Sequence, residues 1–302
     1  MAGLFQQCNG SMDVPYGPRK RMLFGLCRKV CTVGVAVLLA LCAPWLHAGA
    51  WTTAAGHGQI ILTSSLYRTS TTFDSKGNLQ NFDYAGQYRQ FINSAYIECG
   101  LSKRDSFTLN VPGEMLEFKN NYGKMQDAGI GDVEVAWKRR LNPLESKWVL
   151  SSQFLVMFPG YSPTQNPAPG NHQEDLEARL MLGHDGSIAK QHIFWDVEAA
   201  YRYRNGAPAD QFRSDATVGI EFGHRLMAMG QAFAIKGMQN GQPVTANSNP
   251  NLQSDFDLYK VQPSLVLTMF HSTRLQGGWN DAFLGRNTGN GHSVILAVWT
   301  TF

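Results

Sequence analysis

The sequence predicts an all-β protein: a transmembrane antiparallel up-and-down β-barrel of about twelve strands, preceded by a cleaved export signal. Apolar and polar residues alternate with a period of two through most of the chain after residue 50, as they do in strands with one apolar face. No apolar run beyond residue 50 reaches the ~18 residues that suggest a membrane-spanning helix. The chain also stops on an aromatic residue, Phe302, at the end of an alternating segment.

The first fifty residues contain the three parts of an export signal. Arg28 and Lys29 precede a short apolar run over residues 30–43, and Ala48-Gly49-Ala50 then provides small residues for cleavage. We therefore expect a signal peptide over residues 1–50, with an extended n-region, and a mature barrel over residues 51–302.

Three points about this leader stay open at the level of sequence. Its apolar run could be an uncleaved inner-membrane anchor, or a lipoprotein signal cut before Cys42, although bulky Leu41 in Leu39-Ala40-Leu41 stands where such signals carry a small residue. Translation could also begin at Met22 instead of Met1.

Charge and cysteine content exclude several classes of partner. The chain has 26 basic and 23 acidic residues, and removing the leader leaves 21 basic and 22 acidic residues. This balance gives no reason to expect a nucleic-acid partner. Four of the five cysteines lie in the leader, so Cys99 alone remains and no internal disulfide is expected. The sequence implies no cofactor and no metal site.

The alternating segments are long enough to cross a bilayer. Four of them, over residues 131–141, 175–182, 195–204 and 213–222, show the alternation most clearly. Several of the expected strands exceed the ~5–6 residues common in globular sheets and fit the ~9–11 residues of a tilted membrane strand. The twelve expected strands cover residues 58–73, 79–101, 106–118, 128–141, 147–159, 174–187, 191–205, 211–224, 226–240, 255–271, 273–286 and 291–302.

The connections between these strands alternate in length. Those after even-numbered strands are tight, whereas residues 120–127, 160–173 and 241–254 form longer segments after odd-numbered strands. Short turns at one rim and long loops at the other are typical of outer-membrane barrels. An even strand number places both ends of the barrel at the short-turn, periplasmic rim.

The other face of the strands carries charges of both signs. In a barrel these side chains would line the lumen, where they either shape a water-filled passage or pair into networks that fill it. The candidate lumen-lining residues are Asp132, Glu134, Lys138, Arg140, Glu177, Arg179, Asp196, Glu198, Arg202, Arg213, Asp215, Glu221, Arg274 and Arg286.

The last strand resembles the assembly signal of bacterial outer-membrane proteins. Val294, Leu296 and Val298 alternate with more polar neighbours or smaller ones, and Phe302 is the terminal aromatic residue. The resemblance implies that outer-membrane lipid surrounds the protein and that assembly machinery recognises its C-terminal strand.

Three passages resemble an outer-membrane family named for the MetA-pathway of phenol degradation. The first is the Gly129-Ile130-Gly131-Asp132 turn and the strand after it, in which Lys138, Arg140 and Leu141 match and Arg139 replaces the usual aromatic residue. The second is the 94–109 hairpin, where the matching residues are Tyr96, Glu98, Gly100 and Leu101. The third is Gly285-Arg286-Asn287-Thr288 before the final strand. The resemblance implies uptake of aromatic or other hydrophobic compounds.

No pattern of catalytic residues stands out, so we do not expect an enzyme. The mature chain has no His-Glu-x-x-His and no Gly-x-Ser-x-Gly motif. The sequence favours a narrow passive channel or uptake route for small solutes, aromatic or hydrophobic ones among them. The alternative is a non-transporting barrel whose long external loops, residues 165–173 and 240–254, bind a surface partner or polysaccharide; an outer-membrane enzyme ranks below both.

Overall fold

The computed structural model describes residues 49–302, apart from positions 163, 166, 171, 172, 207, 243–254 and 271. Residues 1–48 of the expected signal peptide, and most of the 240–254 loop, therefore lie outside the described residues. Among the described residues, no helix is both long and apolar enough to cross a membrane.

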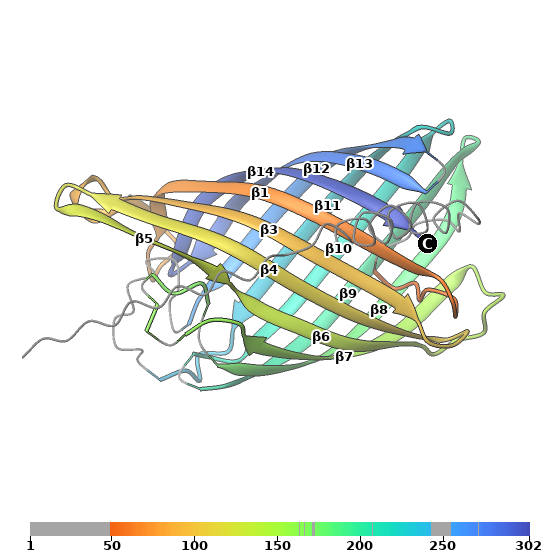
Figure 1. Cartoon of the computed structure of the whole chain (residues 1–302), viewed down its shortest axis with the longest axis horizontal. Coiled ribbons are helices and arrows are strands. Elements are labelled where there is room, and N and C mark those ends of the chain that lie inside the picture. The colour runs from red at the N-terminus through yellow and green to blue at the C-terminus, as the bar shows by residue number, and fades with distance from the viewer. Residues whose placement is uncertain are drawn as a thin grey trace, which may run out of the picture. The chain divides into compact units, whose positions relative to one another are not determined.

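The described chain forms one closed antiparallel barrel of twelve strands, where one interrupted strand is counted once (Figure 1). Neighbouring strands of the barrel follow one another in sequence, and the last strand pairs with the first over most of their length, which closes the wall. The strands of the barrel are β1 (Gly58–Phe73), β3 (Gln87–Gly100), β4 (Asp105–Asn120), the interrupted strand β5 with β6 (Gly123–Ile130 and Asp132–Arg140), β7 (Trp148–Pro159), β8 (Glu174–Ile188), β9 (Gln191–Asn205), β10 (Gln211–Phe222), β11 (Leu226–Gly237), β12 (Asp257–Phe270), β13 (Thr273–Arg286) and β14 (Thr288–Thr301). The expected up-and-down barrel of about twelve strands is confirmed.

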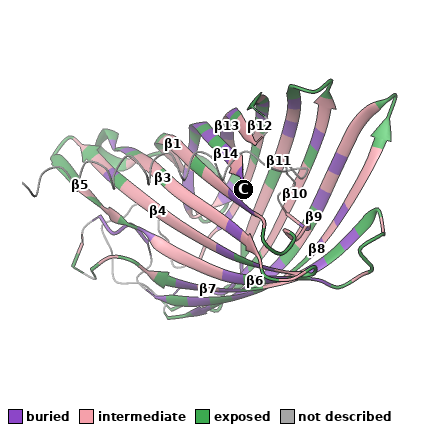
Figure 2. Cartoon of the chain, turned by 45° about the vertical axis from the view of Figure 1, so that its right-hand side comes forward, coloured by how far each residue is buried: buried purple, intermediate pink, exposed green. Residues whose placement is uncertain are grey.

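Burial alternates along strands such as β14 because successive side chains point to opposite faces of the wall (Figure 2). In β14, for example, Leu296 and Val298 are exposed while Ala297 and Trp299 are buried. The exposed face is apolar around the barrel, with members such as Leu62, Phe154, Leu180, Val218 and Leu265. An apolar exterior is the surface that lipid requires, and a closed wall leaves no strand edge unpaired in it.

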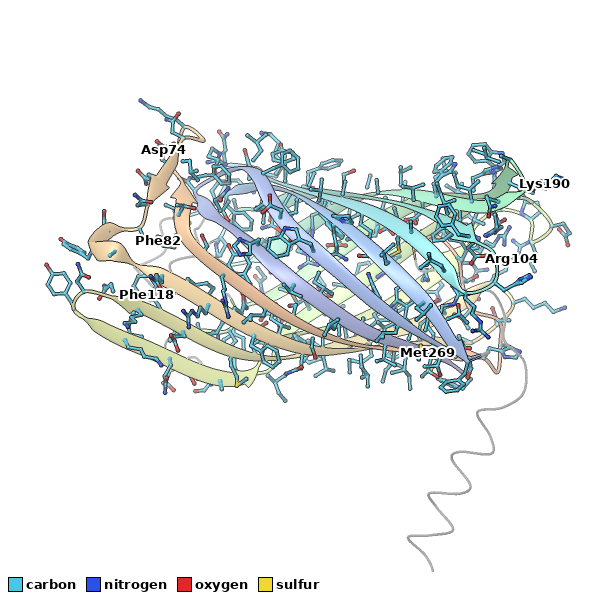
Figure 3. All side chains as sticks on the ribbon, turned by 90° about the horizontal axis from the view of Figure 1, so that it is seen from above. Asp74, Phe82, Arg104, Phe118, Lys190 and Met269 are labelled. Carbon is cyan, nitrogen blue, oxygen red and sulfur yellow. The ribbon has the colours of Figure 1, made fainter. Side chains whose placement is uncertain are left out.

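The two rims differ in the length of their connections. At the rim that carries the chain's C-terminus, β8 and β9 are joined by Ala189 and Lys190, both with positive φ, as a two-residue hairpin turn requires. Arg104, Lys190 and Met269 lie at this rim in Figure 3, whereas Asp74, Phe82 and Phe118 lie at the opposite one. The long connections after β7 and β11 leave from the opposite rim, so we call the two rims periplasmic and external.

Two strand boundaries differ from the sequence prediction. The expected strand over residues 79–101 is broken into β2 (Leu79–Asn81), a 3₁₀ turn η1 (Asp83–Ala85) and β3. Tyr84 and Ala85 adopt positive φ there, and this conformation cannot continue a strand. The expected strand over residues 128–141 is interrupted at Gly131, where the register with β4 shifts by one residue.

The expected loop over residues 120–127 is wrong, because most of it is strand β5. Asn120 makes the tight turn possible, since its side-chain oxygen accepts hydrogen bonds from the backbone N–H groups of Tyr122 and Gly123. The chain can then pair back onto β4, from Asn120 with Gly123 to Gly113 with Ile130. The resulting β4–β5 hairpin projects beyond its neighbours at the left of Figure 1.

Candidate functional site in the barrel lumen

The inward-facing side chains divide the lumen into two sectors. Strands β6 to β10 carry most of the inward-facing charged side chains, and we call them the charged sector. Strands β11 to β14, together with β1 and β3, carry mainly amides, hydroxyls and apolar groups on their inner face, and we call them the uncharged sector. The strand register fixes this division, because one residue per neighbouring strand faces inward at each level.

Glu177 on β8 is the centre of the charged sector. Its carboxylate is fully buried and accepts hydrogen bonds from Arg179 and Arg202, each at 2.8 Å, and forms a longer ion pair with Arg213 at 3.6 Å. The outer members of the network pair in turn, Arg202 with Glu134 at 3.0 Å, and Arg179 with both Glu198 and Asp215. Buried charges are stable only when paired and hydrogen-bonded, so this network links β6, β8, β9 and β10 on the inside of the barrel.

The remaining sequence-derived candidates lie outside this central network. Lys138 donates to Glu98 at 3.0 Å near the periplasmic rim, and Asp196, only 2% exposed, lies on the same level. Arg274 faces Glu221 at 3.8 Å. Arg140 donates to the carbonyl oxygens of the β6–β7 turn, Arg286 pairs with Asp255 and Asp257 at the external rim, and Asp132 lies against Gly170 of the β7–β8 loop.

Sequence reasoning did not single out the uncharged sector. Its inward residues include Met227, Met229, Val266 and Trp299, so both faces of these strands are apolar near the periplasmic rim. The inner face of such strands carries no alternating charges, so the sequence pattern does not distinguish it from the outer face. Glu98 was also missed as a lumen residue, although it stands two residues from Tyr96, whose hydroxyl donates to it at 2.9 Å.

Residues before β1 lie inside the lumen at the periplasmic end, where they contact the inner face of the wall. We call residues 49–53 the N-terminal plug. Lys138 Nζ donates to the carbonyl oxygen of Gly49 at 3.1 Å, Ser151 Oγ donates to that of Ala50 at 2.5 Å, and the backbone N–H of Thr53 donates to Ser106 Oγ at 2.8 Å. These partners stand on β6, β7 and β4, so three polar contacts tie the plug to the wall.

Trp51 fills the space between the plug and the uncharged sector. Its ring meets Phe194 edge-to-face with centroids 6.0 Å apart, and a Cβ added at Gly183 would lie 2.9 Å from Trp51 Cη2. The same ring packs on the buried cluster of Phe194, Met227, Met229, Val266, Ala297 and Trp299. Because this cluster and Trp51 fill the periplasmic end of the uncharged sector, we call them the apolar floor.

A cavity of about 350 Å³ lies above this floor in the external half of the uncharged sector. Its walls are apolar at Ile92, Leu258 and Ile295, and polar at Gln90 and Gln262 among others. The volume is at the low end of the ~300–1,000 Å³ of small-molecule pockets. It is therefore large enough for a compact solute and too small for a folded partner.

The external mouth of the charged sector is covered by two connections. Pro167–Gly170 of the β7–β8 loop are buried, and so are Ala209 and Asp210 before β10. Burial acts to raise the pKa of Asp210, but hydrogen bonds from the Arg204 backbone N–H, the Tyr201 hydroxyl and the Asn240 amide hold it below its usual range. Pro167–Gly170 are thus part of the barrel interior and are not presented to a surface partner.

The lumen shows no arrangement for metal chemistry within the described ranges, where no three His, Cys, Asp or Glu side chains could hold an ion. The closed wall, the apolar exterior and the part-filled lumen define the chain as a β-barrel of the outer-membrane class, whose place is the outer membrane.

The comparisons with known proteins agree with this class. The sequence matches no protein-family model and no curated protein. Among solved structures, the COG4313 outer membrane channel from Pseudomonas putida F1 superposes with a TM-score of 0.61 at 11% identity, covering 85% of this chain and all of that one. The NanC porin gives a TM-score of 0.49 at 10% identity over 80% of this chain and 98% of that one. The CymD monoaromatic hydrocarbon channel gives 0.42 at 7% identity over 83% and 89%.

Proposed function

We propose that this barrel is a passive outer-membrane channel that takes up small, largely apolar solutes, aromatic ones included, and that the N-terminal plug closes it. The observation that carries the proposal is the division of the lumen. A charged sector made rigid by ion pairs leaves an uncharged sector with a cavity and an apolar floor. A wall of many charges would favour ions and sugars, whereas this cavity offers apolar contact, a few hydrogen-bonding groups and one cation, Lys260.

The proposal requires the plug to move. Trp51 is docked between Phe194 and Gly183 at the periplasmic end of the lumen, in the path that a solute would take. Lys138, Ser151 and Ser106 form hydrogen bonds with the plug backbone, and each such bond contributes about 0.5–1.5 kcal/mol net. Transport through the barrel then requires the plug to undock transiently, as locally unfolding segments do.

Several earlier expectations belong to the same proposal. They are export by a signal within residues 1–50 that is cut before the plug, assembly through the C-terminal strand, the lumen-lining role of the candidate charges, and kinship with the MetA-pathway family. At Phe302 the backbone pairs with Gly58 in both directions, at 2.9 and 3.0 Å, which supports a role for the terminal residue in closing the barrel. The proposal treats the chain as a channel and not as an enzyme.

The test is solute flux through the refolded mature chain. Proteoliposomes would be given phenol or benzyl alcohol inside, and efflux would be compared with that of a sugar of similar size; planar-bilayer conductance would be recorded in parallel. We expect flux of the aromatic solutes to exceed that of empty liposomes and to exceed sugar flux. A correctly folded barrel that adds no flux of either solute would contradict the proposal and favour a plugged scaffold.

A further inference from the structure

Lys260 on β12 faces the lumen without the partner that other lumen cations have. Arg179, Arg202, Arg213, Arg274 and Lys138 each lie 3.8 Å or less from a carboxylate oxygen. Within the described part of the chain, Lys260 makes neither a hydrogen bond nor an ion pair. Its Nζ lies 5.6 Å from the centre of the Phe233 ring on the neighbouring strand.

The nearest charges do not compensate this ammonium group. They are Arg213 and Asp215 on β10, which have opposite signs. Arg213 is already paired with Glu177, and Asp215 is already paired with Arg179 at 2.6 Å. Lys260 is half-buried, and an ammonium that is partly removed from water and lacks an anion favours a ligand that brings a negative charge.

Lys260 is also part of the cavity wall. The cavity contains the Lys260 side chain, and no acidic residue contributes to its described lining. On the same face of β12 stand Leu258 and Gln262, two residues to either side, and Ala282 is paired with Lys260 across on β13. Opposite them, Ile92 and Ile295 supply apolar surface. The cavity therefore joins one positive charge to apolar walls.

We propose that this cavity binds a small amphipathic monocarboxylate, with the carboxylate on Lys260 Nζ and a single aromatic ring or short alkyl chain against Ile92, Leu258 and Ile295. The inference rests on the proposed function, because it names the solute class that the same lumen takes up. An ammonium offers three donors to a carboxylate, and such charge-assisted hydrogen bonds are stronger than neutral ones. The amide of Gln262 lies on the same face and can accept or donate beside the bound group.

The experiment compares two solutes that differ mainly in charge, benzoate and benzamide. Binding to the detergent-purified full-length barrel would be measured by calorimetry, and flux would be measured in proteoliposomes. The variants are Lys260→Met, which removes the charge at similar length, and Lys236→Met as the matched control. Lys236 stands on adjacent β11, where it is exposed and pairs with Asp257 at the external rim.

We expect benzoate to bind at least tenfold more tightly than benzamide. Lys260→Met should weaken benzoate binding about tenfold and leave benzamide unchanged, and Lys236→Met should change neither. A second variant, Gln262→Glu, guards against misfolding. It places a carboxylate beside Lys260, and this carboxylate should pair with the lysine and remove the benzoate preference. The folded barrel should still migrate differently from the heated, unfolded chain on a gel.

The outcomes separate the two proposals. Equal binding of the two solutes, or a benzoate preference that survives both Lys260→Met and Gln262→Glu, would overturn the carboxylate site. Phenol flux without any benzoate preference would leave the channel standing and reject the site alone. Lys260-dependent benzoate binding without flux of any solute would support the site and reject the channel.

Discussion

Replacing Trp51 with alanine should open the periplasmic end of the lumen. The ring is the largest side chain of the plug, and it joins the buried cluster around Phe194 and Trp299 to the smaller one formed by Ala50, Val149 and Met181. Without it, the plug keeps its three polar contacts and loses most of its apolar ones. The docked state should therefore become less stable relative to the undocked state.

The size of this effect follows from the burial of the ring. Truncation of a buried Trp to Ala costs about 3–5 kcal/mol, and the lower end applies here because Trp51 is only partly buried. A change of about 3 kcal/mol shifts an equilibrium about 100-fold, since each 1.4 kcal/mol is tenfold. A plug that is undocked 0.1% of the time would then be undocked about 10% of the time.

Planar-bilayer recording measures this population as open time. We expect Trp51→Ala to show more frequent and longer conducting events than the wild type. Trp279→Ala is the matched control, because Trp279 is exposed on the outer face of β13 and has no contact with the plug. Identical traces for Trp51→Ala and the wild type would refute the plug as the gate, and equal increases in both variants would point to general loosening of the barrel.

Three further predictions concern stability, passage width and processing. Glu177→Gln removes the shared anion of three arginines, so the free energy of unfolding should fall by about 3–5 kcal/mol, as measured by the urea dependence of heat-modifiable mobility. Gly291→Ala places a methyl group against the ring of Tyr67, which lines the cavity and must shift, so flux of aromatic solutes should change severalfold in proteoliposomes. Intact-mass measurement of the mature protein should show that Gly49 and Ala50 are retained, because both carbonyl groups are bonded to the wall and Gly49 lies against the Asp196 carboxylate, where a terminal ammonium would be neutralised.

Matched variants decide each case. Glu174→Gln alters an exposed glutamate on the same strand and should leave stability unchanged; a loss equal to that of Glu177→Gln would contradict the network argument. Gly277→Ala meets no atom closer than 3.9 Å and should leave flux unchanged, so a similar change in both glycine variants would contradict the role of Tyr67. A mature chain that begins at Trp51 would agree with the sequence prediction and contradict the structural one.

The sequence predicted the wall of this protein better than its interior. Alternation in β1 gave its bounds, 58–73, because one face must meet lipid and the other must not. The β5 strand escaped because its stability comes from the Asn120 turn and from pairing with β4, and residues 123–130 carry no apolar face.

The lumen was predictable only where it is charged. Glu177 and Arg202 alternate with apolar neighbours and could be assigned to the inner face, but their mutual contacts depend on the register between β8 and β9. The plug could not be found from sequence, because residues 49–53 resemble a cleavage region and their partners stand on β4, β6 and β7. Lys260 was equally hidden, since an unpaired lysine differs from a paired one only in three dimensions.

The separation of the lumen into two sectors has a consequence for how this protein can change. Ion pairs within the charged sector, strands β6 to β10, make the barrel wall rigid, whereas the cavity is built mainly on the other strands. Substitutions at sites more than ~7–10 Å apart with no shared partners usually have additive effects on stability. Residues such as Gln90, Leu258 and Ser293 can therefore be exchanged to suit a new solute with little effect on the ion pairs that hold the barrel. The architecture allows selectivity to diverge among descendants of one ancestral barrel without loss of the fold.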